Sequence, residues 1–164
     1  MYYFSYGSNM SVKRLQSRVP SATKVGIGIL DRHALKFHKV SKSDGSAKCD
    51  AHNTDLPEHF IYGVVYQMAE HEKPHLDRIE GLGYGYEVKE VWIRLHDGAT
   101  VKAFTYYATH IDAALRPFDW YKDHVLRGAR ENELPEAYIH QIEAVACEID
   151  HDKNRREKEL SIYR

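Results

Sequence analysis

The sequence predicts a single domain of the α+β class, with a largely antiparallel sheet or small barrel and helices around it. Two observations favour this class. The segments with strand character mostly come in adjacent pairs that hairpins can join. The helical segments lie near the start, in the middle and together near the end of the chain. A chain of 164 residues is long enough to bury the core of one such domain.

The strands are marked by aromatic and β-branched residues at a spacing of two. The expected strands are residues 2–6, 60–66, 88–95 and 101–107, with two further short strands and a turn within 25–37. His96-Asp97-Gly98 supplies hairpin turn chemistry between the last two strands. The polar segments 41–46 and 53–58 are expected to be loops.

The helices are marked by apolar residues three and four positions apart. The expected helices are residues 11–18, residues 70–79 before Gly81, one after Pro117 that ends at Gly128, and one from about Pro135. In the last helix Leu134, Tyr138, Ile142 and Val145 share one stripe. We assign residues 1–149 to the domain and the charged residues 150–164 to a frayed C-terminal tail.

Charge and composition exclude several partner classes. The formal net charge is -1, so the chain lacks the positive surface that nucleic acid or anionic membranes require. No stretch approaches the roughly 20 apolar residues of a membrane span. Two distant cysteines, Cys49 and Cys147, favour a reducing, cytoplasmic location. Twelve tyrosines indicate a polar cavity, and they could equally serve the interface of a homodimer.

His71-Glu72-Lys73-Pro74-His75 matches the His-Glu-x-x-His pattern of zinc hydrolases. Pro74 argues against a zinc helix, because proline is tolerated only in the first helical turn, where the two histidines need not share a face. Cys49-x-x-His52 and Cys147-x-x-x-His151 lack the spacing of a structural zinc site. We expect a buried thiol in a strand and a second on a helix, and no metal.

Tyr6-Gly7-Ser8-Asn9 lies between an expected strand and an expected helix. A turn of this kind presents successive backbone N–H groups and the positive end of the helix dipole, which suits a carboxylate or an oxyanion. The alternative is a simple turn in which Ser8 or Asn9 caps the helix. These four residues alone leave both interpretations open.

Glu80 ends the second expected helix, where the helix dipole disfavours a negative charge. If tyrosines wall a pocket around this carboxylate, it could carry protons between reacting groups. The alternative is an exposed glutamate at a helix end.

Three segments together resemble the γ-glutamylcyclotransferase family. They are YFSYGSNM at the start, YGVVYQM followed by LDRIEG and GYGY in the middle, and WYKDHVLRGARENELPEAY near the end. Their order and approximate spacing match the family over about residues 2–145. The resemblance implies a small β-barrel with helices around it, and an enzyme that converts a small γ-glutamyl substrate to 5-oxoproline without a cofactor.

The resemblance also implies roles for individual residues. Glu80 would be the acid/base, and the amides of Gly7, Ser8 and Asn9 would cradle the glutamyl α-carboxylate, with Tyr6 and Met10 beside them. Tyr86, Tyr106 and Tyr121 resemble the pocket tyrosines of the family, although Tyr84 could take the place of Tyr86. Asn9 favours γ-glutamyl amino acids as substrates, with glutathione, γ-glutamyl amines or a non-catalytic binding module as alternatives.

Overall fold

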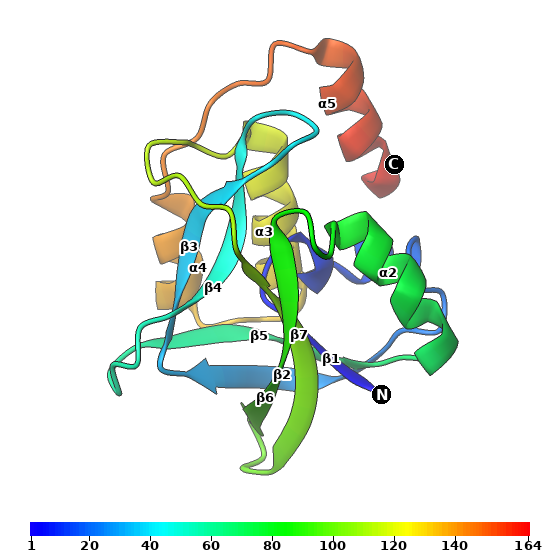
Figure 1. The fold of residues 1–164 in the computed structure, drawn as a ribbon, viewed down its shortest axis with the longest axis vertical. Helices are drawn as coiled ribbons and strands as arrows, with labels where there is room; N and C mark the ends of the chain where they lie inside the picture. Colours follow the sequence, from blue (N-terminus) through cyan, green and yellow to red (C-terminus); the bar gives the residue numbers. More distant parts are fainter.

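The computed structural model describes residues 1–164, and its centre is a closed five-stranded barrel (Figure 1). The strands lie side by side in the order β1 (Tyr2–Ser5), β5 (Phe60–Gln67), β2 (Thr23–Asp31), β6 (Tyr86–Leu95) and β7 (Thr100–Ala108). Neighbouring strands are antiparallel, and β1 closes the barrel through a parallel contact of Tyr3 with Phe104 on β7. The structure therefore confirms the predicted α+β class with a small, largely antiparallel barrel.

The barrel core is formed by side chains that alternate along the strands. Phe4, Ile61, Val65 and Ile93 are all fully buried. The strands come this close because Gly63 has no side chain, and a Cβ at that position would overlap the Phe4 ring and the Ser5 carbonyl. The first strand, which leads into the 6–9 loop, is thereby fixed against its neighbour.

A separate two-stranded sheet lies beside the barrel, formed by β3 (His33–Val40) and β4 (Ala47–Asn53). The polar 41–46 segment joins them, as expected for a loop. Alternation in the sequence did not give the range of β4, although a strand was expected at one of the cysteines. Its buried face carries the small residues Ala47, Cys49 and Ala51, which give little hydrophobic pattern in the sequence. The expected buried thiol in a strand is Cys49, whereas Cys147 lies in a loop after the last predicted helix.

Helices surround the barrel. They are η1 (Ser8–Met10), α1 (Val12–Gln16), η2 (Glu70–Glu72), α2 (Lys73–Glu80), α3 (Asp119–Glu131) and α4 (Glu136–Glu143). These confirm the four predicted helices. The predicted end at Gly128 is wrong, because α3 continues to Glu131. Gly128 instead lets α3 pack onto the start of the chain, since a Cβ there would lie 2.6 Å from the Met10 Cβ. None of the helices is long and apolar enough to cross a membrane.

Residues 153–163 are helical, so the expectation of a frayed tail is wrong. Helix α5 (Lys153–Leu160), drawn in red in Figure 1, contacts α3, and η3 (Ser161–Tyr163) contacts α1. The Asp152 carboxylate accepts a hydrogen bond from the Arg155 amide and caps α5, and Asp150 binds the Arg155 guanidinium. The charged residues of the C-terminal segment, which suggested a frayed tail, therefore form specific ion pairs.

Candidate active site

Glu80 is the last residue of α2, directly before Gly81, which adopts the left-handed conformation at φ 75° and ends the helix. Pro74 lies in the first turn, as predicted. One turn before Glu80, Asp77 accepts a hydrogen bond of 2.7 Å from the Tyr106 hydroxyl on β7 and pairs with Lys73. These contacts fix the last turn of α2 against the barrel.

The Glu80 carboxylate is held through one of its oxygens. Oε1 accepts hydrogen bonds from Asn9 Nδ2 at 2.9 Å and from Arg18 Nη1 at 3.1 Å. The same Arg18 nitrogen donates to Asn9 Oδ1 at 2.9 Å, which closes a three-residue network. The Arg18 guanidinium supplies the positive charge that offsets the unfavourable helix dipole at Glu80. No hydrogen bond of the protein reaches Oε2 of Glu80.

The loop at residues 6–10 approaches this carboxylate from the other side. The alternative in which Ser8 or Asn9 caps a helix is wrong, because both residues lie inside η1 and the Asn9 amide instead binds Glu80 and the Tyr3 hydroxyl. The expected helix dipole is weak, since η1 has three residues. Gly7 brings the loop backbone against β4, because a Cβ there would lie 3.1 Å from the Cys49 Cβ.

Buried tyrosines form the walls of the site, and hydrogen bonds fix their hydroxyl groups. Tyr6 donates to the Tyr106 carbonyl at 2.6 Å, Tyr86 donates to the Cys49 carbonyl, and Tyr121 accepts from the Cys49 amide at 3.0 Å. Burial raises the pKa of Tyr6, Tyr86 and Tyr121 well above the ordinary value of tyrosine. The hydroxyls therefore stay protonated at neutral pH.

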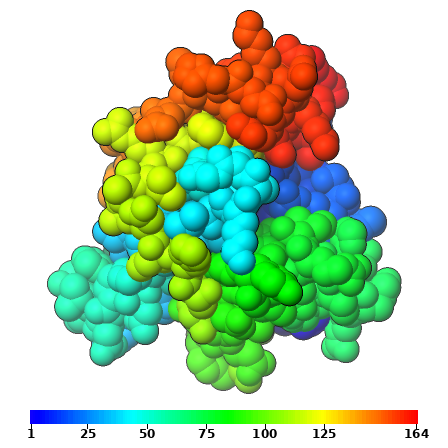
Figure 2. All heavy atoms as spheres, turned by 45° about the horizontal axis from the view of Figure 1, so that its top comes forward, coloured from blue at the N-terminus to red at the C-terminus, as the bar shows by residue number.

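These residues enclose a narrow inner pocket of about 30 Å³. It is lined by Tyr3, Ser5, Tyr6, Gly7, Ser8, Asn9, Cys49, Glu80, Tyr86, Tyr106 and Tyr121. Next to it lies a wider outer cleft of about 560 Å³, formed by segments from α1, the 39–48 turn, the end of α2, the start of α3, and α5. Figure 2 shows the cyan turn between the red α5 and the green α2. Ser8, Glu80, Tyr86 and Tyr121 line both spaces.

The structure brings together eight of the nine residues that the sequence assigned to the site. Met10 is the exception, because its side chain is fully buried in the core where α3 packs at Gly128. Tyr86 rather than Tyr84 lines the pocket, since Tyr84 is 69% exposed.

Four residues of this site were not expected, namely Tyr3, Ser5, Arg18 and Cys49. Tyr3 and Ser5 lie on the same strand face as each other, two positions apart, so spacing could have indicated these two, whereas no spacing indicates Arg18 or Cys49.

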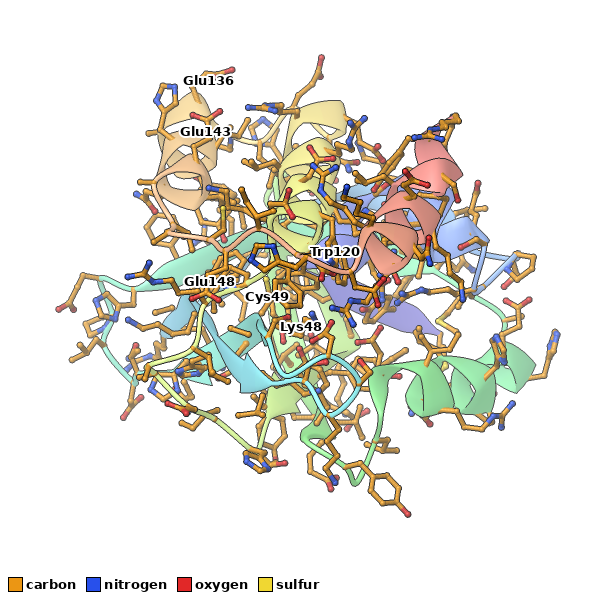
Figure 3. All side chains as sticks on the ribbon, turned by 90° about the horizontal axis from the view of Figure 1, so that it is seen from above. Lys48, Cys49, Trp120, Glu136, Glu143 and Glu148 are labelled. Atoms are coloured by element: carbon orange, nitrogen blue, oxygen red, sulfur yellow. The ribbon has the colours of Figure 1, made fainter.

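Cys49 lies inside the tyrosine wall but is not suited to nucleophilic catalysis. Burial raises the pKa of its thiol to about 12, so the thiolate is scarce at neutral pH. Figure 3 shows Cys49 near the centre of the molecule, with Lys48 and Trp120 beside it, whereas Glu136 and Glu143 project from α4 at the periphery.

The β3–β4 sheet carries one group of side chains that could hold a metal ion, namely His38, Asp50 and His52. Their ligand atoms lie within 4.8 Å of one another. The Asp50 carboxylate already accepts hydrogen bonds from His38 Nε2 at 2.8 Å and from the Ala108 amide at 2.7 Å. None of the three lines the inner pocket or the outer cleft.

The chain is similar to known proteins over most of its length. The AIG2-like family matches residues 60–142. Gamma-glutamylcyclotransferase of Homo sapiens is 31% identical over 149 residues, which cover 87% of this chain and 77% of the human protein. The chain belongs to the γ-glutamylcyclotransferase family. The Mus musculus gamma-glutamylcyclotransferase is 30% identical over 146 residues, with 87% of this chain and 77% of the mouse protein covered.

A solved structure described as a gamma-glutamyl cyclotransferase superposes with a TM-score of 0.84 at 25% identity, covering 96% of this chain and 98% of the other. The AIG2-like match includes Glu80, Tyr86, Tyr106 and Tyr121, whereas the 6–10 loop lies before it. In this member of the γ-glutamylcyclotransferase family, the barrel brings the loop and Glu80 together through the contact of Asn9 with Glu80.

Proposed function

We propose that this protein is a γ-glutamylcyclotransferase that converts γ-glutamyl amino acids to 5-oxoproline and a free amino acid, with Glu80 as the acid/base. One observation carries the proposal. Glu80 Oε1 is held by Asn9 and Arg18, while Oε2 has no protein partner and the residue lines both the inner pocket and the outer cleft. A carboxylate held in this way keeps one oxygen for proton transfer at the junction of the two spaces.

The reaction requires two proton transfers that one carboxylate can perform. Glu80 accepts a proton from the α-ammonium group of the substrate, and the freed amine attacks its own γ-carbonyl carbon. The bond from that carbon to the leaving nitrogen then breaks, and the leaving nitrogen takes this proton from Glu80. The second proton that the attacking nitrogen must lose follows the same route, so the lactam nitrogen keeps one hydrogen and the amine leaves as an ammonium group. General acid–base catalysis of this kind contributes about 10²–10⁴ in rate. The overall step is an intramolecular acyl transfer that consumes no water.

The loop and the tyrosines support this reaction in two ways. Backbone amides at Gly7, Ser8 and Asn9 bind the glutamyl end of the substrate, and the buried wall folds the chain so that its amine meets its carbonyl. The Tyr121 hydroxyl accepts from the Cys49 amide, so its own hydrogen can be donated to the developing oxyanion, whereas Tyr86 and Tyr106 donate to the Cys49 carbonyl and to Asp77 and hold the pocket wall in place.

The finer assignments follow from the same proposal. We place the reaction in the cytoplasm, supported by the free thiols of Cys49 and Cys147, and within the metabolism of glutathione-derived γ-glutamyl compounds. The homodimer stays a prediction that sedimentation of the purified chain would test.

The decisive experiment measures 5-oxoproline release from γ-glutamyl-alanine, glutathione and γ-glutamyl-ε-lysine by the purified protein and by Glu80→Gln. We expect release from γ-glutamyl-alanine and a loss of about 10²-fold or more in kcat for Glu80→Gln. Glu70→Gln, an exposed glutamate just before α2, is the matched control and should keep normal turnover. Near-normal turnover by Glu80→Gln would exclude its acid/base role, and no release from any substrate would favour a binding module.

A further inference from the structure

The outer cleft carries an excess of positive charge, and most of its cations have anionic partners. Arg14 pairs with Glu159, Arg18 with Glu80, Lys48 with Asp44, and Arg155 with Asp150 and Asp152. Lys39 and Lys158 line the cleft without an ion pair. Lys158 is exposed, so water can solvate it, whereas Lys39 is only 8% exposed. Lys39 is therefore the nearly buried lysine of the cleft without a direct ion pair.

Lys39 lines the outer cleft and contacts an aromatic ring and a glycine there. The Nζ atom lies 4.5 Å from the centre of the Tyr86 ring, and no protein acceptor binds it. Its side chain runs along Gly85, where a Cβ would lie 3.0 Å from the Lys39 Cε. Burial lowers the pKa of Lys39, while the negative charges of Glu80 and Asp44 raise it.

The Lys39 side chain is nearly buried and its ammonium group has no carboxylate at ion-pair distance, so an anion bound in the cleft would stabilise it. We propose that Lys39 binds the carboxylate of the leaving amino acid and so selects γ-glutamyl compounds whose leaving amine carries a negative charge. This inference rests on the proposed function. It gives the outer cleft a role in specificity that is separate from the chemistry at Glu80.

The position of Lys39 distinguishes the leaving half of the substrate from the glutamyl half. Lys39 lines the outer cleft but not the inner pocket, whereas the 6–9 loop lines the inner pocket. Glu80 and Tyr86 line both spaces. A substrate whose scissile bond lies at Glu80, with its glutamyl end against the loop, extends its leaving half past the Tyr86 ring toward Lys39.

The test compares two substrates that differ in one group, γ-glutamyl-alanine and the nearly isosteric γ-glutamyl-alaninamide, which has a neutral carboxamide. We expect the wild-type protein to prefer the carboxylate about ten- to hundredfold in kcat/KM, the range of a charge-assisted hydrogen bond. In Lys39→Met this preference should fall to within a few-fold of unity. Lys39→Arg, which keeps the charge, should retain most of it.

Lys42→Met is the matched control, because Lys42 follows in the same segment, lies near the exposed Tyr84 ring and does not line the cleft. It should preserve the preference. A wild-type ratio near one overturns the inference without any variant, as does an unchanged ratio in Lys39→Met. If neither substrate yields 5-oxoproline with the wild-type protein, the proposed function itself fails.

Discussion

Asn9 Nδ2 lies 2.9 Å from Glu80 Oε1, although the two residues are 71 positions apart in the sequence. The contact joins the loop after β1 to the last turn of α2, and Arg18 binds both partners. The two features that the sequence indicated separately are therefore one hydrogen-bonded unit. Conservative substitutions in this unit test how much each hydrogen bond contributes.

Asn9→Asp should lower kcat for γ-glutamyl-alanine about 10- to 100-fold with a smaller change in KM. The substitution replaces the amide donor by a carboxylate oxygen next to Glu80, and two like charges at that distance repel each other. Steady-state kinetics measures the split between kcat and KM. Asn53→Asp, an exposed asparagine at the end of β4, is the control with the same chemical change. Equal kinetics in the two variants would contradict a role for the Asn9 amide.

Tyr106→Phe should reduce the free energy of unfolding by about 1–3 kcal/mol and also lower kcat. The change removes the 2.7 Å hydrogen bond to Asp77 that fixes the last turn of α2. Urea unfolding and 5-oxoproline assays report the two effects. The neighbouring Tyr107 is only partly buried and its hydroxyl makes no hydrogen bond within the protein, so Tyr107→Phe should leave both quantities close to wild type. A Tyr106→Phe protein with unchanged stability would show that Asp77 does not depend on this contact.

Gly128→Ala should destabilise the protein by about 1–3 kcal/mol, although alanine favours helices over glycine by about 1 kcal/mol. The reason is steric, since the new Cβ would lie 2.6 Å from both the Met10 Cβ and the Ser11 nitrogen. Chemical denaturation measures the change. Gly26→Ala, with open space around its Cβ, is the control and should be close to neutral. A stabilised Gly128→Ala protein would mean that α3 shifts without cost.

Acidification should release α5 from α1 and α3. His124 and Arg14 lower the pKa of Glu159 from its ordinary value near 4.5 to about 2. The folded-state pKa lies below the unfolded one, so this contribution is complete above about pH 4.5 and is lost as the pH falls toward 2. Hydrogen exchange of the α5 amides across this range measures the release.

Glu159→Gln removes the titrating group. In this variant, the protection of the α5 amides against hydrogen exchange should therefore depend less on pH over the same range. The exposed Glu157 on the same helix provides the matched Glu157→Gln control. Identical pH profiles in wild type and Glu159→Gln would contradict the assignment.

Much of the fold was predictable because strong alternation marks the strands and turn residues separate them. The range of β4 escaped prediction because its buried face consists of alanines and a cysteine, which carry little hydrophobic contrast. The length of α3 was misjudged because glycine can either end a helix or allow another segment to pack closely, and the sequence does not distinguish these uses.

The site was predictable where a motif carried it, at Gly7, Asn9 and Glu80. It was not predictable where tertiary packing alone selects the residue. Arg18 lies just beyond α1, and only the folded chain shows that its guanidinium reaches Glu80. Met10 was misplaced because a residue next to a binding loop can equally turn into the core, as its complete burial shows.

The tyrosine hydroxyls are mostly held by main-chain atoms. Tyr6 and Tyr86 donate to the carbonyls of residues 106 and 49, Tyr121 accepts from the amide of residue 49, and Tyr66 donates to the carbonyl of residue 10. Every amino acid except proline provides the same amide and carbonyl. A substitution at position 49 can therefore leave the hydrogen bonds of the surrounding tyrosines unchanged. We expect the tyrosines to be more conserved among relatives than the residues whose main-chain atoms bind them.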